Sequence, residues 1–218
     1  MHALIMGPPG AGKGTLAKRL CVMKGLRHLS TGDLFRLNIA EGTELGKAAQ
    51  SYISQGCLVP DQVTDAMVRA ALLGLQPGGG VLLDGYPRTE AQAETLDKIL
   101  DECRSSLDLV LQVCVPDELI VERLTGRRVC PVCGASYHLS YAAPKKALVC
   151  DHCGAALRQR DDDRAETIRA RLDVYHRETE PLVQRYSERG LLRSIDNRGT
   201  PEESEQALCV LLESLEGA

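Results

Sequence analysis

The sequence predicts an α/β fold in which a doubly wound parallel sheet carries two inserted subdomains. Three observations predict it. Short unbroken apolar runs recur along the chain, as buried parallel strands require. Helical patterns lie between these runs, so that strand and helix alternate. Two stretches, 30–59 and 126–163, do not fit the alternation, and we interpret them as loops that have grown into subdomains.

The elements can be assigned in order. We assign strands to the apolar runs at residues 2–6, 81–83, 109–115 and 191–195. The first helix follows the first strand, with one face formed by Leu16, Leu20 and Met23. A long helix from Arg164 to Arg189 should be kinked or interrupted by Pro181.

The final helix shows its start signal in the sequence. Thr200 stands at the N-cap, Pro201 takes the first helical position, and Glu203 closes a capping box. Its apolar face comprises Leu208, Leu211, Leu212 and Leu215. This helix, with its strong N-terminal cap, is the last element in the alternation of strands and helices.

The composition limits the classes of function. The 218 residues are 44% hydrophobic and 26% charged, which is typical of a folded globular chain. A net charge of −4 argues against a sequence-independent grip on nucleic acid, and with no Trp and one Phe the chain lacks a base-stacking platform. The apolar opening, residues 1–6, is far too short for a membrane span or a signal peptide. We therefore expect a cytoplasmic protein without nucleic-acid or membrane partners.

A glycine-rich segment follows the first predicted strand and opens the first predicted helix. Its residues are Gly7, Pro8, Pro9, Gly10, Ala11, Gly12, Lys13, Gly14 and Thr15. The glycines let backbone amides turn inward as an anion nest, the helix N-terminus adds its positive dipole, and Lys13 reaches the outer phosphates. Gly14 follows the lysine where Ser or Thr is usual, and Thr15 comes one place later. The segment predicts a phosphate-binding loop of this unusual form.

This form of the loop resembles that of the adenylate kinases, and the likeness continues segment by segment to the C-terminus. Ser30–Arg36 is similar to the opening of the family's monophosphate site, and Gly56–Asp61 to its adenine-lining close. Asp84–Arg88, with Gln92, is similar to the second half of that site. The resemblance implies a long-lid, zinc-containing P-loop nucleoside monophosphate kinase that converts ATP and AMP reversibly into two ADP.

The resemblance also implies the site residues. Those for ATP are Gly10, Ala11, Gly12, Lys13, Gly14, Thr15, Arg123, Arg127 and Gly199. Those for AMP are Thr31, Arg36, Cys57, Leu58, Val59, Gly85, Tyr86, Pro87, Arg88, Gln92, Arg160 and Arg171. Catalysis is assigned to Lys13, Arg88, Arg123, Arg160 and Arg171. Asp33 and Asp84 would organise the waters around Mg²⁺, although on their own Thr31 could be a helix N-cap and Asp84 a strand-end turn residue.

Arginine suits phosphoryl transfer because its planar guanidinium binds phosphate oxygens bidentately and stays charged. The phosphate nucleophile is already anionic, so no catalytic base is required. The resemblance makes Asp162 and Asp163 partners of the arginines assigned to the site. Taken alone, the acidic run Asp161–Asp163 would be interpreted as a solvated hinge. We interpret other arginines as solvated, namely Arg128, Arg158, Arg164 and Arg169.

Four of the nine cysteines form two Cys-x2-Cys pairs, with sixteen residues between the pairs. The pairs are Cys130 with Cys133 and Cys150 with Cys153. This spacing is typical of a structural zinc site, whose four thiolates leave no open position for water and replace an apolar core. Iron would also suit four thiolates, and His138 and His152 are alternative ligands. We expect the remaining cysteines to be buried or half-buried apolar side chains, namely Cys21, Cys57, Cys103, Cys114 and Cys209.

The predicted domains follow from these assignments. They are a P-loop core at 1–29, 60–125 and 164–218, an AMP-binding subdomain at 30–59, and a zinc-binding lid at 126–163. We expect a monomer whose lid and AMP subdomain close over both nucleotides and exclude water.

Two alternatives stay open at this point. One is another nucleoside monophosphate kinase, with GTP as donor or a pyrimidine acceptor. The other is a zinc-ribbon nucleic-acid adaptor fused to a nucleotide switch, suggested by the basic residues near the cysteines, which are Arg127, Arg128, Lys145 and Lys146. An acceptor site needs the predicted set of Thr31, Arg36, Arg88 and Gln92, and a switch does not, so this set favours an enzyme.

Overall fold

The protein is described by a computed structural model that covers residues 1–76 and 78–216. Within these residues a parallel sheet of five strands has the order β2-β3-β1-β4-β7. The strands are β1 (His2–Met6), β2 (Leu26–Ser30), β3 (Gly80–Asp84), β4 (Leu109–Cys114) and β7 (Leu192–Asp196). All the strands predicted from apolar runs are present. The prediction of a parallel α/β sheet is therefore confirmed.

The sequence pattern missed β2. This strand lies at one end of the sheet order and pairs with β3, from Leu26 opposite Gly80 to Ser30 opposite Asp84. Its apolar residues are not consecutive, because exposed and half-buried residues separate the buried Leu26 and Leu29. Only strands that are buried on both faces need an unbroken apolar run, and an edge strand is less constrained. The apolar-run criterion therefore could not reveal it.

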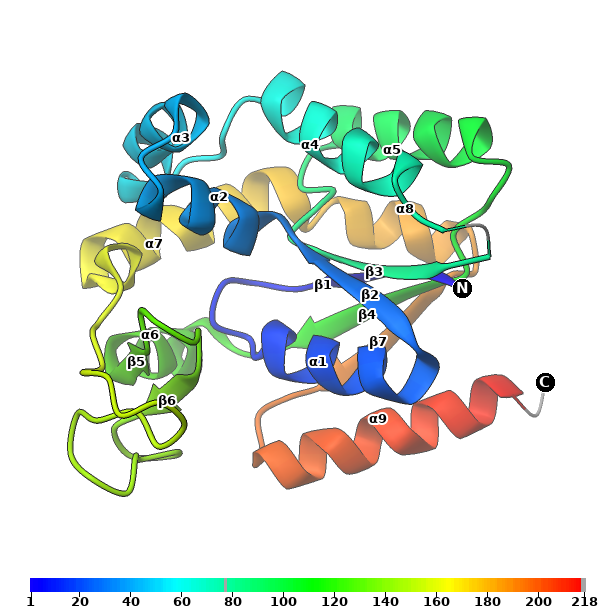
Figure 1. Cartoon of the computed structure of the whole chain (residues 1–218). Helices are drawn as coiled ribbons and strands as arrows, with labels where there is room; N and C mark the ends of the chain where they lie inside the picture. Colours follow the sequence, from blue (N-terminus) through cyan, green and yellow to red (C-terminus); the bar gives the residue numbers. More distant parts are fainter. Residues whose placement is uncertain (77, 217–218) are drawn as a thin grey trace.

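Helices cover both faces of the sheet (Figure 1). One face is covered by α4 (Asp61–Leu73), α5 (Glu90–Glu102) and α8 (Leu182–Glu188), and the other by α1 (Lys13–Lys24) and α9 (Pro201–Glu216). Leu4 and Leu83 pack in the core beneath the first group, and their neighbours Ile5 and Leu82 pack in the core beneath the second. Successive strand residues thus face opposite layers, as the pleat requires. The doubly wound arrangement is confirmed.

The helices α1 and α9, which cover the same face of the sheet, can be compared with their sequence predictions. In α9 the Thr200 hydroxyl accepts a hydrogen bond from the Glu203 amide at 3.2 Å, and the Glu203 carboxylate accepts one from the Thr200 amide at 2.7 Å, so the capping box is confirmed. In α1 the assignment of Met23 to the buried face is wrong, because this side chain is 45% exposed. Cys21, which packs against the core beside Leu20, continues the buried stripe instead.

The predicted long helix after the lid is interrupted, as expected. It divides into α7 (Ala165–Val174), a wider π-helical turn η2 (Tyr175–Thr179) and α8, with Pro181 directly before α8. The Glu180 amide donates to the Tyr175 carbonyl at 2.9 Å, five residues back. Proline has no amide hydrogen and crowds the preceding turn, which is why the helix widens here.

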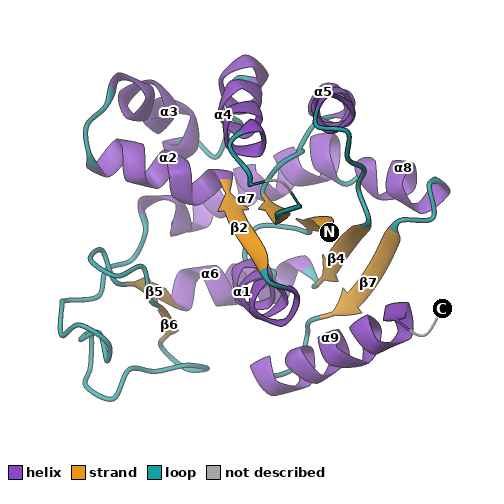
Figure 2. Cartoon of the chain, turned by 45° about the vertical axis from the view of Figure 1, so that its right-hand side comes forward, coloured by secondary structure: helices purple, strands orange, loops and turns teal. Residues whose placement is uncertain are grey.

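The two insertions differ in structure (Figure 2). The first consists of α2 (Thr31–Ala40) and α3 (Glu44–Ser54), which pack so closely that a side chain on Gly46 would lie 2.1 Å from the Asn38 carbonyl oxygen. The second follows α6 (Asp117–Gly126) and is largely irregular, with the short strands β5 (Arg127–Val129) and β6 (Ser136–His138) and the single turn η1 (Asp161–Asp163). In the described part of the chain no helix has both the length and the apolar character to cross a membrane.

Candidate functional site

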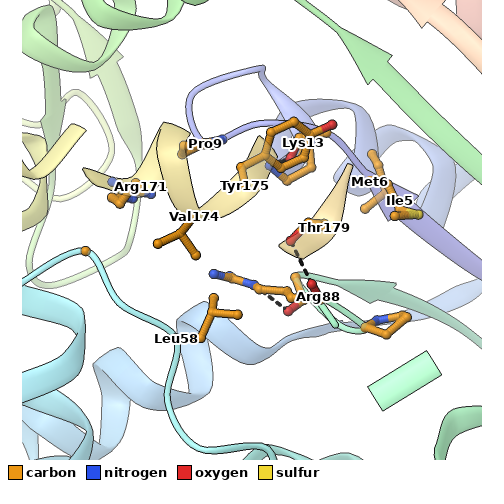
Figure 3. A pocket seen from close by; sticks show the side chains of 14 residues that line it. Ile5, Met6, Pro9, Lys13, Leu58, Arg88, Arg171, Val174, Tyr175 and Thr179 are labelled. Atoms are coloured by element: carbon orange, nitrogen blue, oxygen red, sulfur yellow. Dashed lines mark hydrogen bonds between the residues drawn. The ribbon is translucent and has the colours of Figure 1, made fainter. Parts of the chain in front are cut away.

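The candidate site lies where the winding of the sheet reverses. The helix after β1, α1, covers one face, and the helix after the neighbouring strand β3, α5, covers the other. The loops that leave the carboxyl ends of β1 and β3 therefore diverge and open a crevice, which is the usual ligand position in such sheets. A pocket lies there (Figure 3), and its lining includes the predicted site residues Lys13, Leu58, Gly85, Pro87, Arg88 and Arg171.

The glycine loop has the backbone that an anion nest needs. Gly10 and Gly12 have φ angles of 82° and 87°, in the left-handed region that favours glycine. A side chain on Gly7 would lie 2.5 Å from the Val113 carbonyl oxygen. The other predicted loop residues follow in order, with Ala11 buried and Gly14 and Thr15 exposed in the first turn of α1. Backbone amides and the helix N-terminus thus gather at one place.

Lys13 bridges the loop. Its Nζ donates hydrogen bonds to the carbonyls of Gly7 and Pro8, each at 2.8 Å. Burial lowers the pKa of Lys13 to about 8, which the positive charges of Arg88 and Arg171 reinforce and the carboxylate of Asp84 opposes. Lys13, Arg88 and Arg171 therefore bring positive charge to one place, which suits a polyanionic ligand.

Arg88 extends into the pocket from the opposite wall, between Leu58 and Val174 (Figure 3). Its Nε donates to the Gly85 carbonyl at 2.8 Å. Its backbone is fixed from two sides, since the Arg88 amide donates to Gln92 Oε1 at 2.7 Å and the Thr179 hydroxyl donates to the Arg88 carbonyl at 2.9 Å. These contacts leave the outer nitrogens of the guanidinium group directed at the pocket.

Gln92 and Tyr86 support this loop in the observed conformation. Gln92 is buried, and its Nε2 donates to Asp61 Oδ1 at 2.6 Å while its Oε1 accepts from Arg88. Tyr86 is buried in the core and donates to Asp65 Oδ1 at 2.7 Å. Both side chains thus act on the shape of the loop here, and their contact with AMP stays a prediction.

Thr31 lies at the junction of the first insertion and the crevice. Its hydroxyl donates to the Gly85 carbonyl at 2.9 Å. The N-cap of α2 is Ser30, whose hydroxyl accepts from the Asp33 amide at 3.2 Å, so the N-cap alternative for Thr31 is wrong. Because Thr31 is the first helical residue, its hydroxyl is available for a contact across to β3.

The two carboxylates predicted to organise magnesium waters already have partners. Asp33, in the first turn of α2, forms an ion pair with Arg36. Asp84 ends β3, and its Oδ2 lies 3.4 Å from Nε2 of His28 on the neighbouring strand. Asp33 is 68% exposed and Asp84 is 13% exposed, and the contact of both with the waters around Mg²⁺ stays a prediction.

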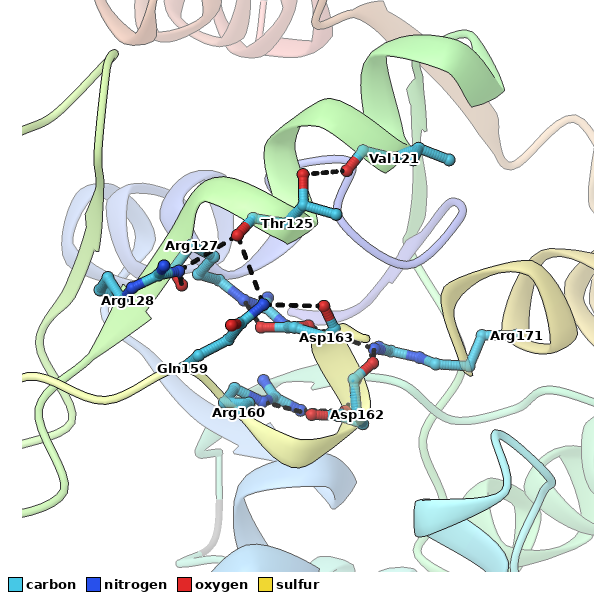
Figure 4. Close-up of polar contacts among 9 residues, drawn as sticks. All are labelled: Val121, Thr125, Arg127, Arg128, Gln159, Arg160, Asp162, Asp163 and Arg171. Carbon is cyan, nitrogen blue, oxygen red and sulfur yellow. Dashed lines mark hydrogen bonds and ion pairs between the residues drawn. The ribbon is translucent and has the colours of Figure 1, made fainter. Parts of the chain in front are cut away.

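Three arginines and two aspartates form a cluster at the base of the lid (Figure 4). Arg127 binds Asp163 in a bidentate pair at 2.8 and 2.5 Å, and Arg160 binds Asp162 in another at the same distances. Arg171 donates to the Asp162 carbonyl at 2.9 Å and lies 3.1 Å from its carboxylate. The prediction of arginine partners for Asp162 and Asp163 is confirmed, and the solvated-hinge alternative is wrong for them, because both are buried.

The cluster carries three positive and two negative charges. Although burial alone would raise the pKa of Asp162, the charges of Arg171 and Arg160 lower that pKa to about 2. Asp162 is therefore ionised at neutral pH, and the two aspartates hold the side chains of Arg127, Arg160 and Arg171 together. A phosphate group entering the crevice would meet arginines that are already gathered and oriented.

Arg123 joins α6 to the turn after β7. Its Nη2 donates to the carbonyls of Arg198 and Gly199 at 3.3 and 3.4 Å. Arg123 and Gly199, both predicted for ATP and 76 positions apart in the sequence, are thus brought together. Arg123 is half-buried, so part of its side chain stays accessible to solvent.

The four lid cysteines form one cluster, with all sulfurs within 4.8 Å of one another. Three sulfur pairs are 3.4, 3.5 and 3.7 Å apart. Sulfurs at about 2.3 Å from a central zinc stand roughly 3.8 Å apart in a tetrahedron, so the donor set fits that ion. Within the described residues the cluster consists of cysteines alone, and neither His138 nor His152 belongs to it.

The two knuckles of the cluster repeat the same backbone geometry. The Gly134 amide donates to the Cys130 carbonyl at 3.0 Å, and the Gly154 amide donates to the Cys150 carbonyl at 2.9 Å. Both glycines are left-handed, with φ angles of 71° and 73°. Two equivalent turns thus present their thiols to one point, which is the arrangement of a closed structural site.

The sequence patterns missed part of the pocket and one cysteine. The pocket is also lined by Val174 at the end of α7 and by Tyr175 and Thr179 of η2. The only feature of the sequence that could have pointed to them is Pro181, which predicts an interruption of the helix close to these residues. Cys57 is exposed, so the expectation of a buried thiol is wrong there, because its segment is an open loop between α3 and α4. The other four cysteines outside the lid are half-buried, as expected.

Comparison with known proteins agrees with this geometry. A model of the family described as Adenylate kinase matches residues 5–191. A curated adenylate kinase of Symbiobacterium thermophilum is 52% identical over 195 residues, covering 89% of this chain and 90% of the relative. One from Clostridium beijerinckii is 49% identical over 212 residues, covering 97% and 98%, and one from Archaeoglobus fulgidus is 50% identical over 196 residues, covering 90% of each.

Proposed function

The chain belongs to the adenylate kinase family, and on that premise we propose how its residues divide the transfer of a phosphoryl group between ATP and AMP. It is a nucleoside monophosphate kinase, and membership of the family implies ATP, AMP and ADP as its substrates. The observation that carries the proposal is the crevice between β1 and β3, which has Lys13 on one wall, Arg88 on the other and the arginine cluster beside them.

On the donor side, the amides of the glycine loop and Lys13 bind the phosphates of ATP. The left-handed Gly10 and Gly12 support this role, because they turn backbone amides toward one point. Arg123 and Gly199 border the donor base, which is consistent with their contact across the turn after β7. Arg127 approaches the outer phosphates from the lid.

On the acceptor side, Arg88 and Arg36 bind the phosphate of AMP, and Thr31 and Gly85 border its nucleoside. The backbone of residues 57–59 closes over the adenine, with Gln92 beside it. Leu58 and Arg88 line the same pocket. This supports the proposal that one AMP molecule contacts Leu58 with its adenine and Arg88 with its phosphate. The two insertions, 30–59 and 126–163, would then close as subdomains over the acceptor and the donor respectively.

In the transfer step, an anionic oxygen of AMP attacks the terminal phosphorus of ATP and ADP leaves. Charge spreads over the equatorial oxygens of the transferring group, and Lys13, Arg123, Arg160 and Arg171 stabilise it. Arg160 and Arg171 are suited to this because Asp162 already orients them. Closure of the lid keeps water from competing with AMP as the nucleophile.

Two metals are part of the proposal. Cys130, Cys133, Cys150 and Cys153 hold zinc as a structural ion, since four protein ligands leave no position for a substrate. Mg²⁺ accompanies ATP, and Asp33 and Asp84 contact it through water. We propose that the enzyme works as a monomer, because the residues with a proposed role in binding or catalysis all lie on one chain.

A coupled assay tests the function. AMP, CMP, UMP and GMP are each offered with ATP or GTP, and AMP with ATP should give the highest kcat/KM. A kcat/KM for a pyrimidine monophosphate or for GTP equal to that for AMP and ATP would instead support another nucleoside monophosphate kinase. Lys13→Ala should fold normally and retain less than about a tenth of kcat/KM, a loss of more than about 1.4 kcal/mol of transition-state stabilisation.

The nucleic-acid adaptor alternative gains no support from the relatives, and weak retention on heparin at moderate salt would remove it.

A further inference from the structure

A buried amide lies behind the glycine loop. Asn197 follows β7 directly and is 7% exposed. Its backbone amide donates to the carbonyl of Cys114 at the end of β4, at 3.0 Å. β1, β4 and β7 are neighbours in the sheet, so Asn197 is anchored to the same rigid edge from which the glycine loop emerges.

The Asn197 side chain makes one contact at each end. Its Nδ2 donates to the carbonyl of Ala11 at 2.5 Å, and its Oδ1 accepts from the hydroxyl of Ser204, on the first turn of α9. The Ser204 hydroxyl also lies 2.9 Å from the Thr200 carbonyl, so its single proton has two acceptors within reach. Because the Ala11 carbonyl can only accept, the nitrogen of the Asn197 amide must face Ala11, and its oxygen then faces Ser204.

The contact of Asn197 with the Ala11 carbonyl determines the direction of the Gly12 amide hydrogen. Across a trans peptide the carbonyl and the next amide hydrogen point in opposite directions. With the Ala11 carbonyl turned back to Asn197, the Gly12 amide hydrogen points away from Asn197 and toward the concave side of the loop. Within residues 1–76 and 78–216 this amide has no hydrogen-bond acceptor, so it is available to a ligand.

Glycine at position 12 leaves room for the side-chain amide of Asn197. A side chain on Gly12 would lie 2.4 Å from Asn197 Nδ2, and the φ of Gly12 is 87°. The absence of a side chain at this position thus lets the amide of Asn197 lie directly against the loop. We propose that Asn197, supported by Ser204, is a positioning residue that orients the Ala11–Gly12 peptide so that the Gly12 amide binds a donor phosphate. The proposal rests on the proposed function, because it assigns ATP phosphates to this loop.

Asn197→Asp is the direct test. The carboxylate that it introduces cannot donate to the Ala11 carbonyl and repels it, so the peptide should lose its fixed direction. We expect the KM for ATP to rise about tenfold or more, the usual consequence of a buried polar group left unpaired, and the KM for AMP to change less than about twofold. Titration calorimetry with ATP alone, well below the melting temperature, should give the same ratio for the Kd.

Asn38→Ala is a matched control. Asn38 has the same pattern of contacts in α2, since its Nδ2 donates to the Leu34 carbonyl at 2.9 Å and its Oδ1 accepts from the Thr43 hydroxyl at 2.8 Å. Loss of this amide should lower the melting temperature without changing the KM for ATP. A change of stability alone therefore cannot imitate the expected result for Asn197.

Ser204→Ala provides the second variant. It removes the donor to Asn197 Oδ1, and we expect a smaller rise in the KM for ATP of about threefold. Combined with Asn197→Ala it should add almost nothing to the effect of Asn197→Ala, because both act on one peptide. The proposal is wrong if the KM for ATP is unchanged, or if both KM values rise together as the melting temperature falls. A wild-type enzyme that does not transfer phosphate from ATP to AMP would instead overturn the proposed function.

Discussion

The two insertions of this kinase are held together by different means. The first, residues 30–59, is a pair of helices whose apolar cluster contains Phe35, Ala49 and Val59. The second, residues 126–163, has little regular structure, and its buried cluster consists of two cysteines with Tyr137 and Leu157. A short helical pair can bury enough apolar surface to order itself, whereas an irregular segment of similar length needs a cross-link.

The difference extends to how each insertion is joined to the core. The apolar cluster of the first insertion continues into α4, where Val63 and Met67 pack against it. The thiol cluster of the second is local, and its base is joined to the core by the arginine and aspartate side chains. The first insertion should therefore unfold together with the core, and the second should be able to lose order while the core stays folded.

The largest expected effect is on the lid. In Cys130→Ser or Cys153→Ser we expect the metal content to fall from one ion per chain toward zero and the melting temperature to fall by several degrees, because metal binding contributes directly to folding. Substantial kinase activity should remain at low temperature, since Lys13 and all the proposed AMP residues except Arg160 lie outside the lid. Metal analysis and activity on the same samples measure both quantities.

Cys209→Ser is the control for the lid variants, because Cys209 is a half-buried thiol of α9 outside the cluster. It should change neither the metal content nor the melting temperature appreciably. Complete loss of activity in a folded, metal-free Cys130→Ser protein would contradict a structural metal and would make the two insertions more alike than we propose.

Next in size is the effect of opening the apolar cluster of the first insertion. Phe35→Ala should lower the free energy of unfolding by about 3 kcal/mol, because it leaves a cavity beneath α3. The KM for AMP should rise, and urea unfolding should stay a single transition because this cluster includes residues of α4. Leu37→Ala, at a position of the same helix that is 54% exposed, should change both quantities little. A separate early transition in Phe35→Ala would show that the first insertion also unfolds alone.

The assignment of one substrate to each side can be tested at Arg88. Arg88→Ala should weaken the binding of AMP by about 2 to 3 kcal/mol, seen as a higher KM for AMP with lower turnover, because a charge-assisted phosphate contact is lost. The KM for ATP should be nearly unchanged. Arg169→Ala, an exposed arginine of α7, serves as the control. A selective loss of ATP binding would mean that the two sites are assigned the wrong way round.

The smallest effect concerns acid stability at the base of the lid. The pKa of Asp162 is lowered to about 2, so its stabilising contribution is full above its ordinary pKa near 3.8 and is lost as the pH falls through about 2. Asp162→Asn should therefore reduce the free energy of unfolding by up to about 2 kcal/mol at neutral pH and much less near pH 2. Urea unfolding from pH 7 to 2 measures this difference. Asp161→Asn, at the exposed neighbour, should show no such dependence.

The sequence by itself determined the chemistry of this protein. The glycine loop after an apolar strand, the paired cysteines and the capping box of the last helix are local patterns, and each was found where its spacing predicted. Local patterns are readable because hydrogen bonds and metal ligands within a few residues need fixed spacings. The resemblance to adenylate kinases rested on such motifs, and the relatives agree with it.

Only the tertiary structure decided contacts between distant segments. β2 escaped detection because an edge strand needs no continuous apolar run, and Met23 was misplaced because core packing selects which side of an amphipathic stripe is covered. The contact of Asn197 with Ala11 joins residues 186 positions apart, and no spacing in the sequence encodes it. Such contacts depend on the order of strands in the sheet, which brings the ends of β1, β4 and β7 together and thereby sets the direction of a single peptide in the phosphate loop.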